Sequence, residues 1–328
     1  MNSINIYQQI KTIIVYSFFV IVIIGIIFNS LTFIIFSRRR FKQTVFYTYF
    51  RCLIISDTIC LIMPINKVLE YNYNIYIEKM SSFLCKSRVY LPYSISPISG
   101  WILVVISLDR WISITNLYKF ELRKKFWFQI LICFLIFVFN FFVYSPALMF
   151  KLEENTDLSN LTNQTNNDFI CSSSNYSKLI QWMDAFEGCI IPFSIMILFT
   201  CLTIMFIYLS RKKTTSLLSN RNINNINKQS TMKKRDVRFA IVSVILNVIF
   251  LMLNSPYTFL NLFDDFISNQ SISELSESIR LFFYYLNFSI TFFINFYVNS
   301  TFRDEFLILI GKKSSSYNNP SYRKSVVG

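Results

Sequence analysis

Long apolar runs, separated by short polar or basic segments, recur along the whole chain. An α-helix needs about 20 apolar residues to cross a hydrocarbon layer about 30 Å thick, and the runs have at least this length. There are seven of them, at residues 12–37, 46–69, 84–115, 126–149, 179–209, 235–261 and 275–300. No alternating pattern indicates a barrel. The pattern therefore predicts an all-α membrane protein, a seven-transmembrane helix bundle.

Basic residues gather on one side of the predicted membrane. Of the 32 Lys and Arg residues, 24 lie in the segments 38–51, 110–125, 211–238 and 303–328. By the positive-inside rule this side is cytoplasmic, and the N-terminus is extracellular. Topology and the anionic lipid of the inner leaflet explain the basic surplus, so no nucleic-acid partner is implied. The outer segments carry 12 acidic and eight basic residues, which favours a cationic ligand.

The two ends of the chain differ in kind. The first run is too long for the core of a signal peptide and ends in Arg38-Arg39-Arg40, so we expect it to be retained. A short amphipathic stretch follows the last run and predicts a helix on the membrane surface. Its apolar residues are Phe302, Phe306, Leu307 and Leu309, and its charged residues are Arg303, Asp304 and Glu305. We therefore expect an extracellular N-terminus (1–11), the bundle (12–301), and a surface helix with a cytoplasmic tail (302–328).

Glycosylation signals test this topology independently, because Asn-x-Ser/Thr is modified only on the lumenal side. Asn160, Asn163 and Asn175 follow the fourth run, and Asn269 follows the sixth. The predicted topology places all four outside the cell, and this agreement supports it. The same signal at Asn287 and Asn299 falls in or below the last run. We interpret those two as chance occurrences in an Asn-rich chain.

Composition argues against an enzyme and against a metal site. The chain has no histidine, which removes the commonest general base and the commonest metal ligand. Its seven cysteines include no Cys-x-x-Cys pair, so a zinc or iron–sulfur site is not expected. We expect no catalytic residues and no metal ligands.

Polar residues stand at particular depths inside the apolar runs, where each is costly unless it is paired. The first run contains Gly25-x-x-x-Asn29, the second contains Leu53-x-x-x-Asp57, and the third ends in Asp109-Arg110-Trp111, 25 residues after Cys85. Prolines interrupt four runs at Pro64, Pro146, Pro192 and Pro256. Over about residues 12–310 this set resembles the rhodopsin-like (class A) G-protein-coupled receptors, in which the third motif is Asp-Arg-Tyr.

The resemblance implies a charged latch at the inner rim. Arg110 would be held at rest by Asp109 and by Asp236, which lies 20 residues before Pro256, and Trp111 takes the place of the family's tyrosine. Charge-assisted pairs at a partly wet helix end can bias two states and still break. We expect Asp236→Ala to raise basal signalling. Charged residues at a helix end can also be only a solvated terminus.

The resemblance also implies a hinge in the sixth helix. Proline loosens a helix locally, and Pro256 follows Phe250, whose position matches the family's core switch aromatic. The family's Cys-Trp-x-Pro reads Leu253-Asn254-Ser255-Pro256 here, so Asn254 replaces the toggle tryptophan, a change seen among some peptide receptors.

Two further expectations follow from the resemblance. Asn29, Asp57, Ser99 and Asn287 would form an allosteric sodium pocket, since oxygen ligands suit a hard cation. The alternative is that Asp57 is a buried carboxyl satisfied within the bundle. Separately, a disulfide between Cys85 and Cys171 would pin the loop after the fourth helix across the outer mouth, where the oxidising exterior permits it.

Two other helices depart from the family. Thr291 and Asn295 stand where the seventh helix usually has the ends of Asn-Pro-x-x-Tyr, and Thr200 stands where the fifth usually has tyrosine. Without these tyrosines, activation could differ from the family's. A receptor-shaped decoy or scavenger that does not activate G proteins therefore stays open.

The outer halves of the helices bear on the ligand. Pro92 and Tyr285 occupy the family's amine-anchoring and retinal-lysine positions, which excludes both of those ligand types. The remaining vestibule is acidic, polar and aromatic, and it suits a basic or amidated neuropeptide. Its residues are Glu70, Tyr93, Gln181, Asp184, Glu187, Tyr257, Asn261, Asp264, Asp265, Tyr284 and Tyr285. Each of them could instead be a solvated rim residue, and Asp184 is the strongest candidate for a ligand contact.

These observations together predict a plasma-membrane receptor, of the invertebrate neuropeptide kind, that couples an extracellular peptide ligand to a heterotrimeric G protein and to arrestin-like regulators. A small transporter or channel is the rival from another class. Such a protein needs several ionisable residues along a pore, or repeated broken helices. Only Asp57 lies deep, and no internal repeat is found.

Overall fold

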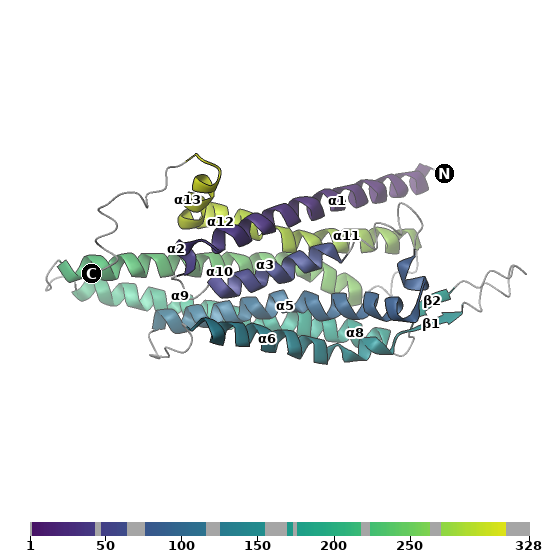
Figure 1. Cartoon of the computed structure of the whole chain (residues 1–328), viewed down its shortest axis with the longest axis horizontal. Helices are drawn as coiled ribbons and strands as arrows, with labels where there is room; N and C mark the ends of the chain where they lie inside the picture. The colour runs from purple at the N-terminus through teal and green to yellow at the C-terminus, as the bar shows by residue number, and fades with distance from the viewer. Residues whose placement is uncertain are drawn as a thin grey trace, which may run out of the picture.

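The computed structural model describes residues 2–42, 47–63, 76–115, 125–154, 169–172, 176–217, 224–262 and 270–312. Within them, long helices run side by side along one axis (Figure 1). The helices that form the spans are α1 (Asn2–Phe36), α3 (Tyr47–Ile62), α5 (Ser82–Thr115), α6 (Phe126–Val143), α8 (Ser177–Met183), η4 (Asp184–Ile190), α9 (Ile191–Leu217), α10 (Asn224–Leu262), α11 (Gln270–Ser289) and α12 (Thr291–Val298). The short helices are α2 (Arg39–Lys42), η1 (Ile77–Lys79), η3 (Ser145–Met149) and α13 (Ser300–Leu309).

The predicted spans appear as helices in the described residues. Five helical stretches are long and apolar enough to cross a membrane, and the pair Leu275–Ser289 and Thr291–Val298, bent by 46°, makes a sixth. The remaining predicted span is α3, whose 16 described residues fall short of that length criterion. The seven-helix architecture agrees with the prediction from the apolar runs. The first helix begins at Asn2, so residues 2–11 of the expected extracellular N-terminus belong to α1.

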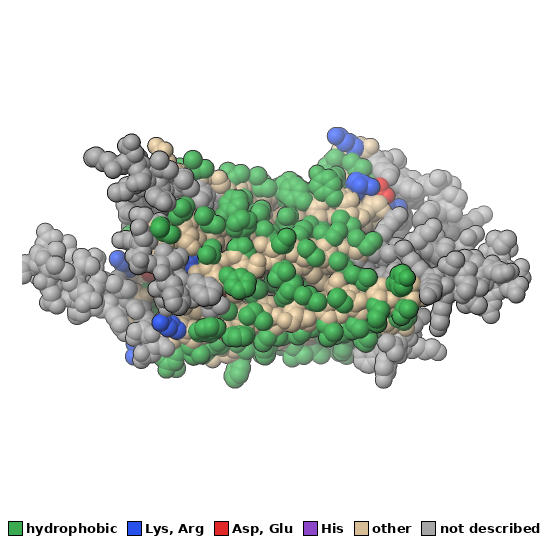
Figure 2. All heavy atoms as spheres, turned by 180° about the vertical axis from the view of Figure 1, so that it is seen from behind, with side chains coloured by type: hydrophobic (Ala, Val, Ile, Leu, Met, Phe, Trp, Pro, Cys, Tyr) green, Lys and Arg blue, Asp and Glu red, His purple; other side chains and the backbone are tan. Residues whose placement is uncertain are grey.

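Apolar side chains form the outer surface of the bundle. On the face shown in Figure 2 they cover the middle of the molecule, and Lys and Arg side chains gather toward its two ends. Helix α6 is the clearest case, because only 17% of its candidate span is buried inside the protein. Its exposed apolar residues are Phe126, Trp127, Ile130, Leu131, Phe134, Leu135, Val138, Phe139 and Phe142. This distribution is what a hydrocarbon solvent favours.

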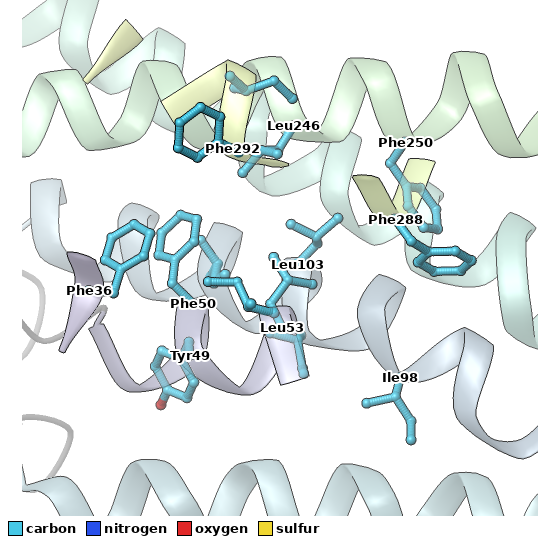
Figure 3. Close-up of a cluster of buried hydrophobic side chains, with 14 of the residues drawn as sticks. Phe36, Tyr49, Phe50, Leu53, Ile98, Leu103, Leu246, Phe250, Phe288 and Phe292 are labelled. Carbon is cyan, nitrogen blue, oxygen red and sulfur yellow. The ribbon is translucent and has the colours of Figure 1, made fainter. Parts of the chain in front are cut away.

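The interior holds a continuous apolar core. Figure 3 shows part of it, with side chains converging from α1, α3, α5, α10, α11 and α12. Close packing needs a small residue at Gly25, where an added Cβ would lie 2.8 Å from both Leu61 Cδ1 and Ser289 Cβ. Gly25 therefore lets α1 approach α3 and α11, as small residues do between membrane helices.

Two helices are irregular near their middles. The fifth span changes from α-helix to π-helix over Asp184–Ile190 before Ile191 begins α9. A π-helical turn inside an α-helix frequently marks a functional site, because it re-aims side chains. The seventh span breaks at Ile290, between α11 and α12.

The outer end carries a hairpin that the all-α prediction left out. Strand β1 (Lys151–Glu154) pairs antiparallel with β2 (Phe169–Ser172), and both lie at the same end as the start of α1 (Figure 1). Leu152 faces Cys171 in the register. The strands were missed because four-residue segments inside a long polar loop give almost no period-2 pattern.

The predicted surface helix is α13, which lies at the opposite end of the bundle (Figure 1). The Asn299 side chain caps it by accepting hydrogen bonds from the backbone N–H groups of Thr301 and Phe302. The Phe302 side chain is fully buried against Phe36. The buried Glu305 pairs with Arg38 Nη1 at 3.3 Å and with Arg40 Nη1 at 3.2 Å.

Candidate functional site

The inner rim holds a buried arginine. Arg110, near the inner end of α5, is only 2% exposed, and its Nη2 lies 3.6 Å from Asp109 Oδ2. Trp111 is half-buried and packs on Phe199 of α9, with ring centroids 5.7 Å apart. Asp236 lies on α10, but its side chain is outside the described residues. The arrangement keeps the guanidinium out of solvent beside one carboxylate.

A second polar group lies around Asp57 in the middle of the bundle. Asp57 Oδ1 accepts a hydrogen bond of 2.6 Å from Ser99, and Oδ2 accepts one of 3.4 Å from Thr291. A small cavity with room for about one water molecule adjoins these groups, and Asn287 also lines it. Asn29 is buried, and its Nδ2 donates to the Phe288 carbonyl at 3.0 Å.

Asp57, Ser99 and Asn287 of the expected sodium pocket thus share one cavity, whereas Asn29 ties α1 to α11 beside it. The cavity could hold a cation between carboxylate, hydroxyl and amide oxygens. Thr291 was not among the expected ligands. The available clue was its position, which is that of the polar asparagine in the family's seventh-helix motif.

The switch region of α10 contacts α5 closely. A Cβ added at Gly100 would lie 3.0 Å from Phe250 Cζ, so the phenylalanine ring rests on that glycine. Asn254 is buried, and its Nδ2 donates to the Phe250 carbonyl at 2.9 Å, within the turn that precedes Pro256. Asn254 therefore stabilises its own helix at the proline and makes no inter-helix hydrogen bond among the described residues.

Two buried carboxylates occupy the π-helix at the outer half of the bundle. Asp184 is 6% exposed and Glu187 is 7% exposed. Trp101 Nε1 donates to Glu187 Oε1 at 2.6 Å, and the fully buried Tyr144 lies beside the same carboxylate. No hydrogen bond or ion pair reaches Asp184 from any described residue.

Aromatic and basic groups complete the outer region. Tyr257 stacks on Tyr284 with ring centroids 4.5 Å apart, and Tyr284 packs edge-on against Tyr285. Arg280 is 5% exposed and donates to the Leu260 carbonyl at 3.2 Å and to Asn261 Oδ1 at 3.4 Å.

Arg280 adds a positive charge to the vestibule, which was expected to be acidic, polar and aromatic. The residue was missed because its basic side chain lies near the end of an apolar run, where a solvated position is the usual interpretation. Its spacing from Tyr284, one helical turn, was the available clue.

Some of the other expected outer residues lie within the described part of the chain and some do not. Tyr93 stacks on Tyr144 with centroids 6.2 Å apart, and Gln181 is half-buried on α8. Glu70, Asp264, Asp265 and the glycosylation candidates Asn160, Asn163 and Asn175 lie outside the described residues. The two signals interpreted as chance have buried structural positions, Asn287 at the cavity and Asn299 as a helix cap.

The outer hairpin is bonded covalently to the bundle. Cys85, buried at the top of α5, forms the expected disulfide with Cys171 on β2, with the two Cα atoms 5.6 Å apart. The prediction of this pair is confirmed. The bond fixes the hairpin over the outer end of the third span.

The chain matches one family over most of its length. The sequence profile of the family described as 7 transmembrane receptor (rhodopsin family) matches residues 28–296. The protein belongs to this family of receptors. No individual curated protein matches the chain.

Membership settles the class of this rhodopsin-family receptor. It is a non-enzymatic, multi-pass protein of the plasma membrane, built as a seven-helix bundle, in the family of class A G-protein-coupled receptors. The rival interpretation as a transporter or channel is therefore wrong.

Proposed function

We propose that this receptor recognises an extracellular peptide with a basic group, as a neuropeptide receptor does. The observation that carries the proposal is the burial of Asp184 in the outer half of the bundle. A carboxylate inside a membrane span is costly unless it gains a partner, and acids there mark binding sites by default. A guanidinium or ammonium group of a ligand would be such a partner.

The surroundings of Asp184 support a peptide over a small amine. The stacked pair Tyr257 and Tyr284 offers aromatic faces to aromatic side chains of a ligand. Arg280 and Asn261 offer polar groups on the opposite helices, α11 and α10. A ligand that engages all these groups has to be extended and to carry several kinds of side chain.

Signal transmission would use the inner rim. Outward movement of α10 would carry Asp236 away from Arg110, and the freed Arg110 would leave its place beside Asp109. The movement would open a surface for a heterotrimeric G protein, and afterwards for arrestin-like regulators. A sodium ion in the cavity beside Asp57 would favour the resting arrangement. Asp236 of α10 is expected to help hold Arg110 in the resting receptor, so Asp236→Ala is expected to raise basal signalling.

The test is a panel of amidated and basic peptides applied to cells that express the chain, with calcium and cyclic-nucleotide responses measured. At least one peptide is expected to give a response that Arg110→Ala abolishes. Asp184→Asn should lower the potency of that peptide about 10- to 100-fold, as for a lost charge-assisted bond. Asp304→Asn, on α13 at the inner side, removes the same charge as a control. Unchanged potency in Asp184→Asn would contradict the proposed ligand contact.

A second candidate is a receptor that binds its ligand without activating a G protein. It is favoured by Asn295, which is fully buried and donates to the Thr291 carbonyl of its own helix at 2.9 Å, where the family has a tyrosine. Specific binding of a labelled peptide, with no guanine-nucleotide exchange in wild type or in Asp236→Ala, would select this candidate.

A further inference from the structure

One amide side chain joins three helices in the inner half of the bundle. Asn247 of α10 is 4% exposed, and its Nδ2 donates to Ser107 Oγ of α5 at 2.9 Å and to Thr200 Oγ1 of α9 at 3.1 Å. A single amide nitrogen carries two N–H groups, so both bonds can form at once. Ser243, one turn earlier on α10, lies with its Oγ 3.5 Å from Ser107 Oγ. We call these four residues the inner polar cluster.

The cluster lies between the two regions expected to change during activation. Ser107 precedes Arg110 by three residues on α5, and Asn247 precedes Phe250 by three residues on α10. Each bond of Asn247 therefore crosses the contact that has to open if the inner half of α10 moves outward.

The surroundings strengthen these bonds relative to solvent. The cluster is flanked by the buried apolar residues Leu103, Ile106, Val242 and Leu246. A hydrogen bond between membrane helices contributes modestly to the stability of their packing. A typical bond changes the equilibrium constant between the closed and opened arrangements about threefold, and the strongest bonds change it more than tenfold. Two such bonds are enough to bias a two-state helix movement without locking it.

One atom of the cluster is unsatisfied. Asn247 Oδ1 is buried and has no hydrogen-bond partner among the described residues. A buried acceptor without a donor raises the free energy of the arrangement that hides it. Water that reached the cluster in an opened arrangement would supply the missing donor. The closed arrangement is therefore stabilised by the two hydrogen bonds of Asn247 Nδ2 and destabilised by the unsatisfied Oδ1.

We propose that the inner polar cluster is a second latch, which holds α10 against α5 and α9 in the resting receptor. Thr200 stands where the family usually has tyrosine, so this contact differs from the one that the usual residue would make. The inference rests on the proposed function only for its link to signalling. The effect of Asn247 on the distance between the helices can be measured without any ligand.

The experiment measures helix separation and basal activity in the same variants. Spin labels at Trp127→Cys and Ile241→Cys, both exposed positions, report the distance between the inner parts of α6 and α10, in a Cys201→Ser background that removes the exposed free cysteine. Asn247→Leu keeps the approximate volume and removes both bonds. It is expected to shift the distances to longer values and to raise basal guanine-nucleotide exchange about three- to tenfold.

Three companion variants make the result specific. Thr200→Val removes one bond and is expected to give a smaller shift in the same direction, and it covers the case in which Asn247→Leu does not fold. The double variant Asn247→Leu/Thr200→Val should give the same distances and exchange rate as Asn247→Leu alone, because Asn247→Leu already removes the hydrogen bond to Thr200. Val248→Ala, the next residue along, is 52% exposed and should change neither measurement.

Unchanged distances in both Asn247→Leu and Thr200→Val, or additive effects in the double variant, would overturn the latch. Longer distances without nucleotide exchange in any variant would support the latch and would instead contradict signalling through a G protein.

Discussion

Ser99 donates a hydrogen bond of 2.6 Å to the Asp57 carboxylate, and this bond joins α5 to α3 beside the small central cavity. The carboxylate of Asp57, the hydroxyl of Ser99 and the side-chain amide of Asn287 line this cavity. Oxygen atoms of these kinds are the ligands that hard cations prefer.

A sodium ion bound there should stabilise the folded receptor by an amount that grows with the ratio of the sodium concentration to the Kd. The purified receptor is expected to melt at a higher temperature in sodium chloride than in choline chloride of equal ionic strength. Asp57→Asn should abolish the difference, and Asp304→Asn should preserve it. A sodium effect that survives in Asp57→Asn would place the ion elsewhere.

Gly25 is expected to tolerate no larger residue. In Gly25→Ala the new Cβ would lie 2.8 Å from atoms of both α3 and α11, and neither Leu61 nor Ser289 can move away without disturbing the core. Overpacking of this kind typically costs about 1–3 kcal/mol. Thermal unfolding in detergent should show a lower midpoint for Gly25→Ala, while Ile24→Ala, on the exposed face, should be close to wild type. Equal midpoints for Gly25→Ala and wild type would show that the helices can separate freely.

Glu305→Gln is expected to loosen α13. The buried carboxylate pairs with two half-buried arginines, so its neutral replacement leaves Arg38 and Arg40 close together without their anion. The arginines are partly solvated, which limits the loss to about 1 kcal/mol. Hydrogen exchange of the backbone amides of residues 300–309 should become faster, with Asp304→Asn as the neighbouring control. Unchanged exchange would mean that Phe302 alone holds the helix.

Cys85→Ser should impair the receptor more than a change at any of the free cysteines. Loss of a native disulfide typically costs about 2–5 kcal/mol, and here it also frees the hairpin from α5. Surface expression and peptide binding should both fall, and Cys171→Ser should reproduce the effect. Cys201→Ser, at an exposed free cysteine, should leave both unchanged. Normal peptide binding in Cys85→Ser would show that the hairpin position is irrelevant to the ligand.

Much of the architecture could be predicted because hydropathy, charge asymmetry and motif spacing report on the membrane directly. The pairing of Cys85 with Cys171 followed from the family resemblance, and so did the place of Asp57 beside Ser99. These are features in which residue type and depth suffice.

The positions of individual side chains could not be predicted, because they depend on the packing of distant helices and not on local sequence patterns. The burial of Arg280 and the docking of Glu305 between two arginines require knowledge of which helix faces meet. No local pattern in the sequence predicts the π-helical turn at Asp184–Ile190 either, in which Asp184 Oδ1 lies 3.0 Å from where a Cβ on Gly188 would be. The hydrogen bonds of Asn247 could not be predicted from the sequence either, because they depend on how α10 faces α5 and α9.

The lipid-facing stripe of α6 has an evolutionary consequence. Side chains such as Phe134 and Phe142 are mostly exposed on the surface that lipid would cover, so selection at these positions should act on apolar character more than on identity. Related receptors should therefore drift rapidly there among Phe, Leu, Ile and Val while rejecting charge. Gln129 and Asn140, buried on the inward face of the same helix, should change slowly.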